Sequence, residues 1–210
     1  MVGADPQAFL DMSSFNAVPD GEGKPLPAFH RLKYLLYEDP LLPLFGDDMR
    51  ELPLTAHYEG LAAGYAAYRD AAADPFRLLF DFYAQLAKTV ALKCDWRSRA
   101  ADAVRRGDRS EAAALAELAD RMLAQLDRLK SVWKALWFST NKPYGFEVID
   151  LRVGGLRSRV ESARERMAAF ASGTLDTIEE LAAPKLTSGE ADGGADRRGN
   201  WKTIVSPGIV

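Results

Sequence analysis

The sequence predicts a mainly α-helical protein, an antiparallel bundle of three long helices plus short helices, with an extended proline-rich segment at its N-terminal side. Apolar residues recur at intervals of three and four through residues 74–172, which is the spacing of one helix face. Gly107 and Gly173 each follow such a stretch, at the place where glycine commonly ends a helix. Because the connection at Gly107 is short, the two helices that it joins should pair antiparallel.

Residues 1–55 precede the predicted bundle and do not look like the start of an independent domain. They contain seven of the eleven prolines, together with apolar runs at 35–37 and 41–45. An extended segment with this much apolar surface is expected to lie against something larger, either the helices downstream or a partner outside this chain. We therefore predict a connector over residues 1–55 and a helical bundle domain over residues 56–183.

The chain changes character after residue 183. Residues 184–200 are polar and rich in glycine, which predicts a flexible linker. Residues 201–210 open with the apolar run Trp201-Lys-Thr-Ile-Val205. An apolar tail behind a flexible linker is expected to dock, on this domain or on another.

The bundle is expected to begin with a short helix over residues 56–72. Its apolar face carries four residues that we expect in the core: Tyr58, Leu61, Tyr65 and Tyr68. The first long helix should start at Asp74-Pro75, an N-cap residue followed by proline in the first turn. We predict one continuous helix from there to Arg106, roughly 45 Å long at about 1.5 Å per residue.

The second long helix should begin at Asp108, which forms a capping box with Glu111. It is expected to stop within Ser139–Lys142, because Pro143 disfavours helical conformation in the residue before it. These two boundaries predict a helix long enough to cover the first one along its length.

The third long helix is predicted over Val153–Ser172, with Gly173 ending it and a short capped turn of helix at residues 176–181. The helix contains the pair Gly154-Gly155, although each glycine weakens a helix by about 1 kcal/mol relative to alanine. We expect a backbone packed closely against a neighbouring helix to compensate.

The connection between the second and third long helices, within residues 141–156, is the least generic part of the sequence. Its polar side chains need partners if they are buried. We interpret it as a tight connection whose polar groups cap helix ends, and the alternative is a polar constellation that faces a ligand. The residues concerned are Asn141, Tyr144, Glu147, Asp150 and Arg152. The apolar residues between them are expected to point inward: Phe146, Val148, Ile149 and Leu151.

Composition and motifs exclude several classes of function. The net charge is -3, and no basic excess points to nucleic acid. No stretch approaches the roughly 20 apolar residues needed to cross a membrane, so no membrane partner is predicted. The two histidines, His30 and His57, belong to no metal-binding spacing, and no phosphate-binding loop occurs. We therefore predict no metal and no cofactor.

The single cysteine, Cys94, is expected to pack on the buried face of its helix. One cysteine excludes an internal disulfide framework and suits a reducing compartment. Residues 1–10 also lack the pattern of a signal peptide, and we predict a cytoplasmic protein. Five arginines near the end of the first long helix are expected on a solvated surface, because acidic residues flank them. They are Arg97, Arg99, Arg105, Arg106 and Arg109.

Three stretches together resemble one family. Trp137 with the run Asn141-Lys-Pro-Tyr-Gly-Phe-Glu-Val-Ile-Asp-Leu-Arg-Val-Gly-Gly-Leu156 resembles the C-terminal helical region of a bacterial branch of glycoside hydrolase family 20. Lys33-Tyr-Leu-Leu-Tyr-Glu-Asp-Pro-Leu-Leu42 resembles the segment that follows the catalytic barrel of those enzymes. Trp201-Lys-Thr-Ile-Val-Ser-Pro207 resembles their C-terminal end, so the resemblance spans most of the chain.

The resemblance implies a parent enzyme with a (β/α)8 barrel that removes terminal N-acetylglucosamine or N-acetylgalactosamine from glycans. Members of the family use the acetamido group of the substrate as nucleophile, with an adjacent Asp-Glu pair that orients it and supplies the general acid. This chain has no Asp-Glu dipeptide, and Glu38-Asp39 has the reverse order. A barrel alone needs about 250 residues, so no catalytic residue carries over to this sequence.

The resemblance favours an accessory helical domain of a β-N-acetylhexosaminidase-like protein, not catalytic on its own, whose partner is the catalytic barrel or a second subunit. The alternative is a freestanding helical interaction module or homodimer, and a third hypothesis is a self-contained enzyme that uses the polar residues of the connection. A domain that belongs against a barrel should expose a large apolar patch. An enzyme should gather those polar residues in one concave pocket.

If the polar groups of the connection have the structural role given above, Asp150→Ala should lower the melting temperature, because one of those polar groups would be lost. Differential scanning calorimetry of the two proteins measures the shift, and an unchanged melting temperature would count against the structural interpretation.

Overall fold

The structure, a computed structural model, describes residues 3–17, 31–42, 50 and 52–183. The described residues are mostly helical and contain no strand. The helices are α1 (Gln7–Leu10), the 3-10 helix η1 (Asp11–Phe15), α2 (Arg31–Tyr37), α3 (Leu54–Ala71), α4 (Phe76–Lys93), α5 (Trp96–Arg106), α6 (Arg109–Thr140), α7 (Phe146–Ala171) and α8 (Glu179–Ala182).

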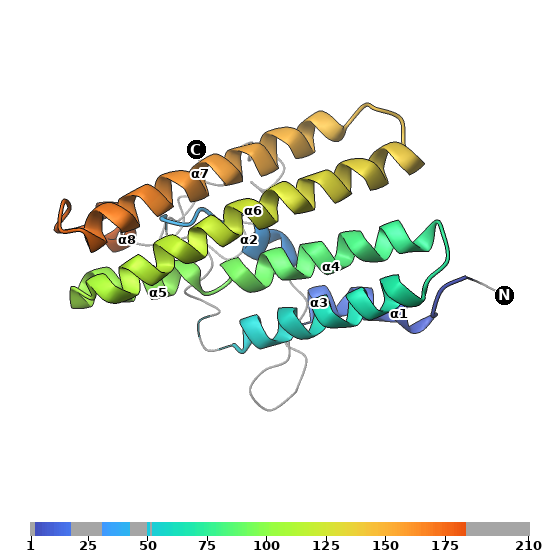
Figure 1. Cartoon of the computed structure of the whole chain (residues 1–210), viewed down its shortest axis with the longest axis horizontal. Coiled ribbons are helices and arrows are strands. Elements are labelled where there is room, and N and C mark those ends of the chain that lie inside the picture. Colours follow the sequence, from blue (N-terminus) through green and yellow to red (C-terminus); the bar gives the residue numbers. More distant parts are fainter. Residues whose placement is uncertain (1–2, 18–30, 43–49, 51, 184–210) are drawn as a thin grey trace, which may run out of the picture.

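The long helices lie side by side in the order α3, α4, α6, α7, each antiparallel to the one before (Figure 1). Helix α5 continues the path of α4 along the first half of α6, and α2 lies across the middle of the bundle (Figure 1). The predicted fold class, a mainly α antiparallel bundle with additional short helices, is confirmed. No described helix is long and apolar enough to span a bilayer.

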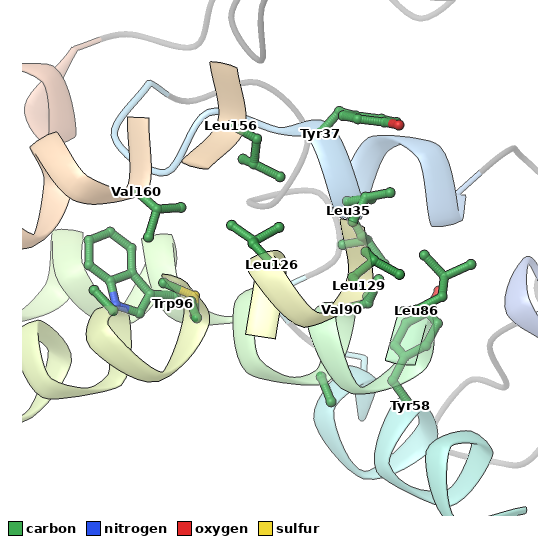
Figure 2. Close-up of a cluster of buried hydrophobic side chains, with 14 of the residues drawn as sticks. Leu35, Tyr37, Tyr58, Leu86, Val90, Trp96, Leu126, Leu129, Leu156 and Val160 are labelled. Carbon is green, nitrogen blue, oxygen red and sulfur yellow. The ribbon is translucent and has the colours of Figure 1, made fainter. Parts of the chain in front are cut away.

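The core fills the space that α2, α4, α6 and α7 enclose (Figure 2). Leu35 of α2 lies beside Leu129 of α6 and Val90 of α4, and all three are almost fully buried. Leu156 on α7 continues this layer toward the other end of the bundle (Figure 2). Each apolar side chain that is fully buried here contributes roughly 1.5–3 kcal/mol through removal from water.

The predicted continuous helix from residue 74 to Arg106 is wrong, because α4 ends at Lys93 and α5 begins at Trp96. The break places Trp96 in the core, where its indole N–H donates to the Leu115 carbonyl of α6 at 3.0 Å. The N-cap predicted for this helix at Asp74 was also wrong, since Asp74 makes no capping hydrogen bond and α4 begins after Pro75.

Only one of the two hydrogen bonds of the predicted capping box is present at the start of α6. Asp108 accepts from the backbone N–H of Glu111 at 3.0 Å, as a capping residue does. The Glu111 carboxylate, which a capping box would turn back to Asp108, instead pairs with Arg99 of α5 at 2.8 Å. The first turn of α6 is therefore tied to the neighbouring helix.

Helix α7 begins at Phe146, seven residues before the predicted start, and the connection shrinks to residues 141–145. Gly145 has φ 99° and precedes the first helical residue. Phe146 and Ile149 are buried as predicted, but Val148 and Leu151 are 45% and 60% exposed. The inward orientation predicted for those two was wrong, because helical periodicity turns them away from α6.

The described parts of residues 1–55 include the short helices α1, η1 and α2, and tyrosines of α3 bind α1 and η1. Tyr58 donates through its hydroxyl to the Phe15 carbonyl at 2.7 Å, and Tyr65 donates to the Ala8 carbonyl at 2.8 Å. Phe15 itself is buried among the rings of α3 and α4. Tyr58 and Tyr65 are thus core, as predicted, and they also satisfy backbone acceptors of the N-terminal segment, whereas Leu61 and Tyr68 are only partly buried.

The boundaries predicted for the connector and the bundle stay predictions, and the linker at residues 184–200 and the tail at 201–210 lie outside the described residues. Gly154 does not pack closely against a neighbouring helix, since a Cβ built there would meet nothing within 4 Å. That expectation was wrong for Gly154.

We predict that Gly145→Ala lowers the free energy of unfolding by about 1–3 kcal/mol, the usual cost of a non-glycine residue in a left-handed conformation. A Cβ at this position would also lie 3.1 Å from Cζ2 of Trp137. Urea denaturation measures the change, and an unchanged midpoint would contradict the left-handed geometry.

The matched variant Gly154→Ala should raise the free energy of unfolding by about 1 kcal/mol, because alanine favours the helix and the site has room for its methyl group. The same urea titration measures it. A loss of stability at this position would mean that something approaches Gly154 more closely than its open surroundings indicate.

Candidate functional site

The five polar residues singled out in the connection do not converge on one pocket. Asn141 ends α6, where its backbone N–H donates to the Trp137 carbonyl at 2.8 Å. The Glu147 carboxylate accepts from the backbone N–H of Gly145 at 2.7 Å, at the start of α7. Tyr144 between them is 84% exposed. Of these three residues, only Glu147 makes a helix-end contact through its side chain, because the contact of Asn141 is made by its backbone.

The other two lie on different sides of α7. Asp150 pairs with Lys130 of α6 at 2.9 Å, with side chains 48% and 38% exposed. Arg152 points toward α2 and lies over the ring of Tyr37 at 6.0 Å. Because an exposed ion pair contributes about 0.2–1 kcal/mol, the loss of melting temperature expected for Asp150→Ala is small.

A set of buried polar contacts holds the described segment 31–42 against the bundle, and we call it the polar latch: Asp39, Lys93, Arg97 and Arg159. Lys93 is buried at the end of α4 and donates to the carbonyls of Leu35 at 3.0 Å and Glu38 at 2.5 Å. Arg97 on α5 is also buried and donates to the Leu41 carbonyl at 3.3 Å.

Asp39 is the acidic member of the latch and is only 2% exposed. Its carboxylate accepts two hydrogen bonds from Arg159 of α7, at 2.6 and 3.2 Å. It also accepts from the backbone N–H groups of Leu41 and Leu42, at 2.9 and 3.0 Å. Four donors thus satisfy one buried carboxylate, and the segment is joined to both α4–α5 and α7.

The surroundings of Asp39 and Lys93 in the latch shift the pKa values of both side chains. Burial is the largest influence on Asp39 and raises its pKa, but the hydrogen bonds from Arg159, Leu42 and Leu41 and the charge of Arg159 outweigh it, so the pKa is lowered. Burial lowers the pKa of Lys93, against the opposing pull of the nearby acidic residues Glu38 and Asp39. The Nζ of Lys93 donates to two backbone carbonyls, so its polar group is satisfied inside the core.

The sequence did not reveal the latch, because its partners lie 55 to 120 residues apart. One signal was present, since Lys93 lies among apolar residues near the end of the first long helix. The prediction of a solvated surface was wrong for Arg97, which is buried. It was also incomplete for Arg109, which lies over the Phe170 ring at 5.0 Å.

Large apolar side chains that remain exposed among the described residues gather at one end of the bundle, which we call the apolar end. α1, the α3–α4 turn and the α6–α7 connection lie at this end (Figure 1). The exposed residues are Phe9, Leu10, Phe138, Tyr144, Val148 and Leu151. Surface residues of this size are unremarkable singly, but six on one end form a candidate interaction surface.

A groove of about 320 Å³ opens at the apolar end, between the start of α4 and the end of α6. Its walls are mainly apolar and include Phe76, Leu79, Trp133 and Trp137, with Asn141 at one edge. Phe9 of α1 packs edge-on against Phe76 at 5.8 Å, so α1 continues the same surface. The groove could receive one or two apolar side chains of a partner.

A second groove, of about 390 Å³, lies between α2, α4, α6 and α7. Val148 and Trp133 line it beside Arg152, and Trp133 lines the first groove as well. Asn141 and Arg152 thus face different grooves, and the geometry does not gather the five polar residues into one site.

One comparison with known proteins gave a match. The model of the family described as Glycoside Hydrolase 20C C-terminal domain matches residues 7–198, a range that includes every described helix. No curated protein matches the chain.

We predict that Asp39→Asn lowers the free energy of unfolding at pH 7 by about 2–3 kcal/mol, because Arg159 keeps its charge and loses its buried partner. The lowered folded-state pKa means that the carboxylate stabilises the wild type above its ordinary pKa of 3.8 and loses that effect as pH falls through the folded value. The variant should therefore lose less stability than the wild type between pH 7 and pH 3.

Urea denaturation at both pH values measures these effects. The control is Asp150→Asn, which removes an exposed carboxylate from its pair with Lys130 and should cost at most about 1 kcal/mol. Equal stability of Asp39→Asn and the wild type at pH 7 would contradict the role given to the latch.

Proposed function

The chain belongs to the Glycoside Hydrolase 20C C-terminal domain family, and we propose that it acts as the helical accessory domain of a β-N-acetylhexosaminidase-like glycoside hydrolase, packed against the catalytic barrel. The observation that carries the proposal is the extent of the match, which runs over residues 7–198. The parent activity is the removal of terminal N-acetylhexosamine from glycans. The cytoplasmic location predicted from the sequence belongs to the same proposal.

The packing of the chain supports a domain that folds by itself and binds something else. Its core is continuous across α2, α4, α6 and α7, and the latch satisfies the buried carboxylate of Asp39. The apolar end in contrast leaves large side chains in contact with solvent. An accessory domain needs both properties, a stable body and an apolar contact face.

The structural environment of Glu38-Asp39 supports a non-catalytic role for this chain. Those residues are the nearest approach to an Asp-Glu pair in the sequence. Asp39 is buried and its carboxylate already accepts from Arg159 and two backbone N–H groups. A carboxylate occupied in this way is a structural anchor, and we propose that the acid and the orienting residue of the parent belong to its barrel.

The proposal is tested with two purified proteins, this chain and a family 20 catalytic barrel from the same organism without a helical C-terminal domain. Size-exclusion chromatography measures complex formation, and a chromogenic β-N-acetylglucosaminide measures turnover. We expect no turnover by the chain alone, co-elution of the two proteins, and a higher melting temperature of the barrel in the complex, because binding to the folded state stabilises it.

Three outcomes would contradict the proposal in different ways. Turnover by the chain alone would mean that other residues replace the missing Asp-Glu pair. A monomer that leaves the barrel unchanged would favour a freestanding interaction module. A stable homodimer that does not bind the barrel would favour the second copy as the natural partner.

A further inference from the structure

We propose, on the basis of the proposed function, that the apolar end is the face of the bundle that contacts the catalytic domain. The surface consists of α1, the α3–α4 turn, the C-terminal turns of α6 and the first two turns of α7 (Figure 1). The occupant to which we commit is the catalytic barrel that precedes this domain in a parent protein.

The two ends of the bundle differ in how their apolar side chains are covered. At the end where α8 lies, Phe170, Ile178 and Leu181 are all buried. Arg109 covers the Phe170 ring at 5.0 Å, and Arg166 pairs with Glu180 of α8 at 2.7 Å. None of the exposed large apolar residues of the described chain lies there. This end is closed by side chains of the domain itself, whereas the apolar end is not.

The course of the chain points to the same end. The matched family is a C-terminal domain, so the catalytic domain of a parent lies on the N-terminal side. Residues 3–7 lie at the apolar end, beside the α3–α4 turn, where the carbonyl of Gly3 accepts from the N–H of Ala73 at 2.8 Å (Figure 1). A domain that precedes this one in a parent chain would therefore join it at the apolar end.

The chemistry of the surface matches a protein partner that offers apolar side chains. Tyr144 is 84% exposed at the tip of the α6–α7 connection, and Leu151 projects 60% exposed from the outer side of α7. Tyrosine is among the residue types that commonly dominate the binding energy of an interface once they are buried at its centre. The groove between Phe76 and Trp137 adds a recess beside these projections. The outside of a (β/α)8 barrel is a ring of helices, whose side chains can fill such a recess.

The test uses the catalytic barrel named above as the probe, with its dissociation constant for the chain measured by isothermal titration calorimetry. Tyr144→Glu and Leu151→Glu each place a charge in the apolar end. The matched control is Ala113→Glu, which places the same charge on an exposed position in the first turns of α6, at the opposite end. We expect each of the two variants to bind at least tenfold more weakly than the wild type, and the control to bind equally well.

The possible outcomes distinguish failure of this inference from failure of the proposed function on which it rests. If the wild type does not bind the barrel, the proposed function fails. If the wild type binds and both apolar-end variants bind as tightly, the function stands and the inference is overturned. Weaker binding by Ala113→Glu alone would overturn it as well. It would also be overturned if the wild type self-associates and Leu151→Glu abolishes that self-association but leaves barrel binding unchanged. Circular dichroism of each variant checks its fold, and Leu10→Glu on α1 replaces any variant that does not fold.

Discussion

The buried side chain of Lys93 holds the segment around α2 against the bundle. Lys93 donates to the backbone carbonyls of Leu35 and Glu38. The carboxylate of Asp39, which lies nearby, pairs with Arg159 on α7. Desolvating such groups is expensive unless every one is hydrogen-bonded. With the latch in place, Leu35 and Leu41 are buried and the core between α4, α6 and α7 is covered. Without it, that side of the bundle would be open to water.

The latch also separates two tasks that an accessory domain must combine. The domain needs a body that is stable without its partner, and the segment 31–42 completes that body. It also needs a contact face, and the exposed side chains of the apolar end are not required by the core. Substitutions in the latch should therefore act on stability, whereas substitutions at Tyr144 or Leu151 should act on association.

The sequence predicted those features whose causes are local. The helical spacing of the α3 tyrosines, the Asp108 cap and the glycines that follow α5 and α7 each depend on residues within a few positions of one another, although the carbonyls that Tyr58 and Tyr65 bind lie 43 and 57 residues away. The break at Cys94-Asp95 was missed because the core position of Trp96 depends on a carbonyl 19 residues away. The latch was missed for the same reason over longer separations. The exposure of Leu151 follows from the start of α7 at Phe146, which periodicity alone did not locate.

The most direct measurement of which end faces the catalytic domain is site-specific photocrosslinking. A benzophenone amino acid replaces Tyr144 in one protein and Ala113 in another, and each is irradiated with the catalytic barrel. Our account predicts a covalent adduct with the barrel from position 144 and none from position 113. An adduct from position 113 alone, or an adduct from position 144 with a second copy of this chain instead of the barrel, would contradict it.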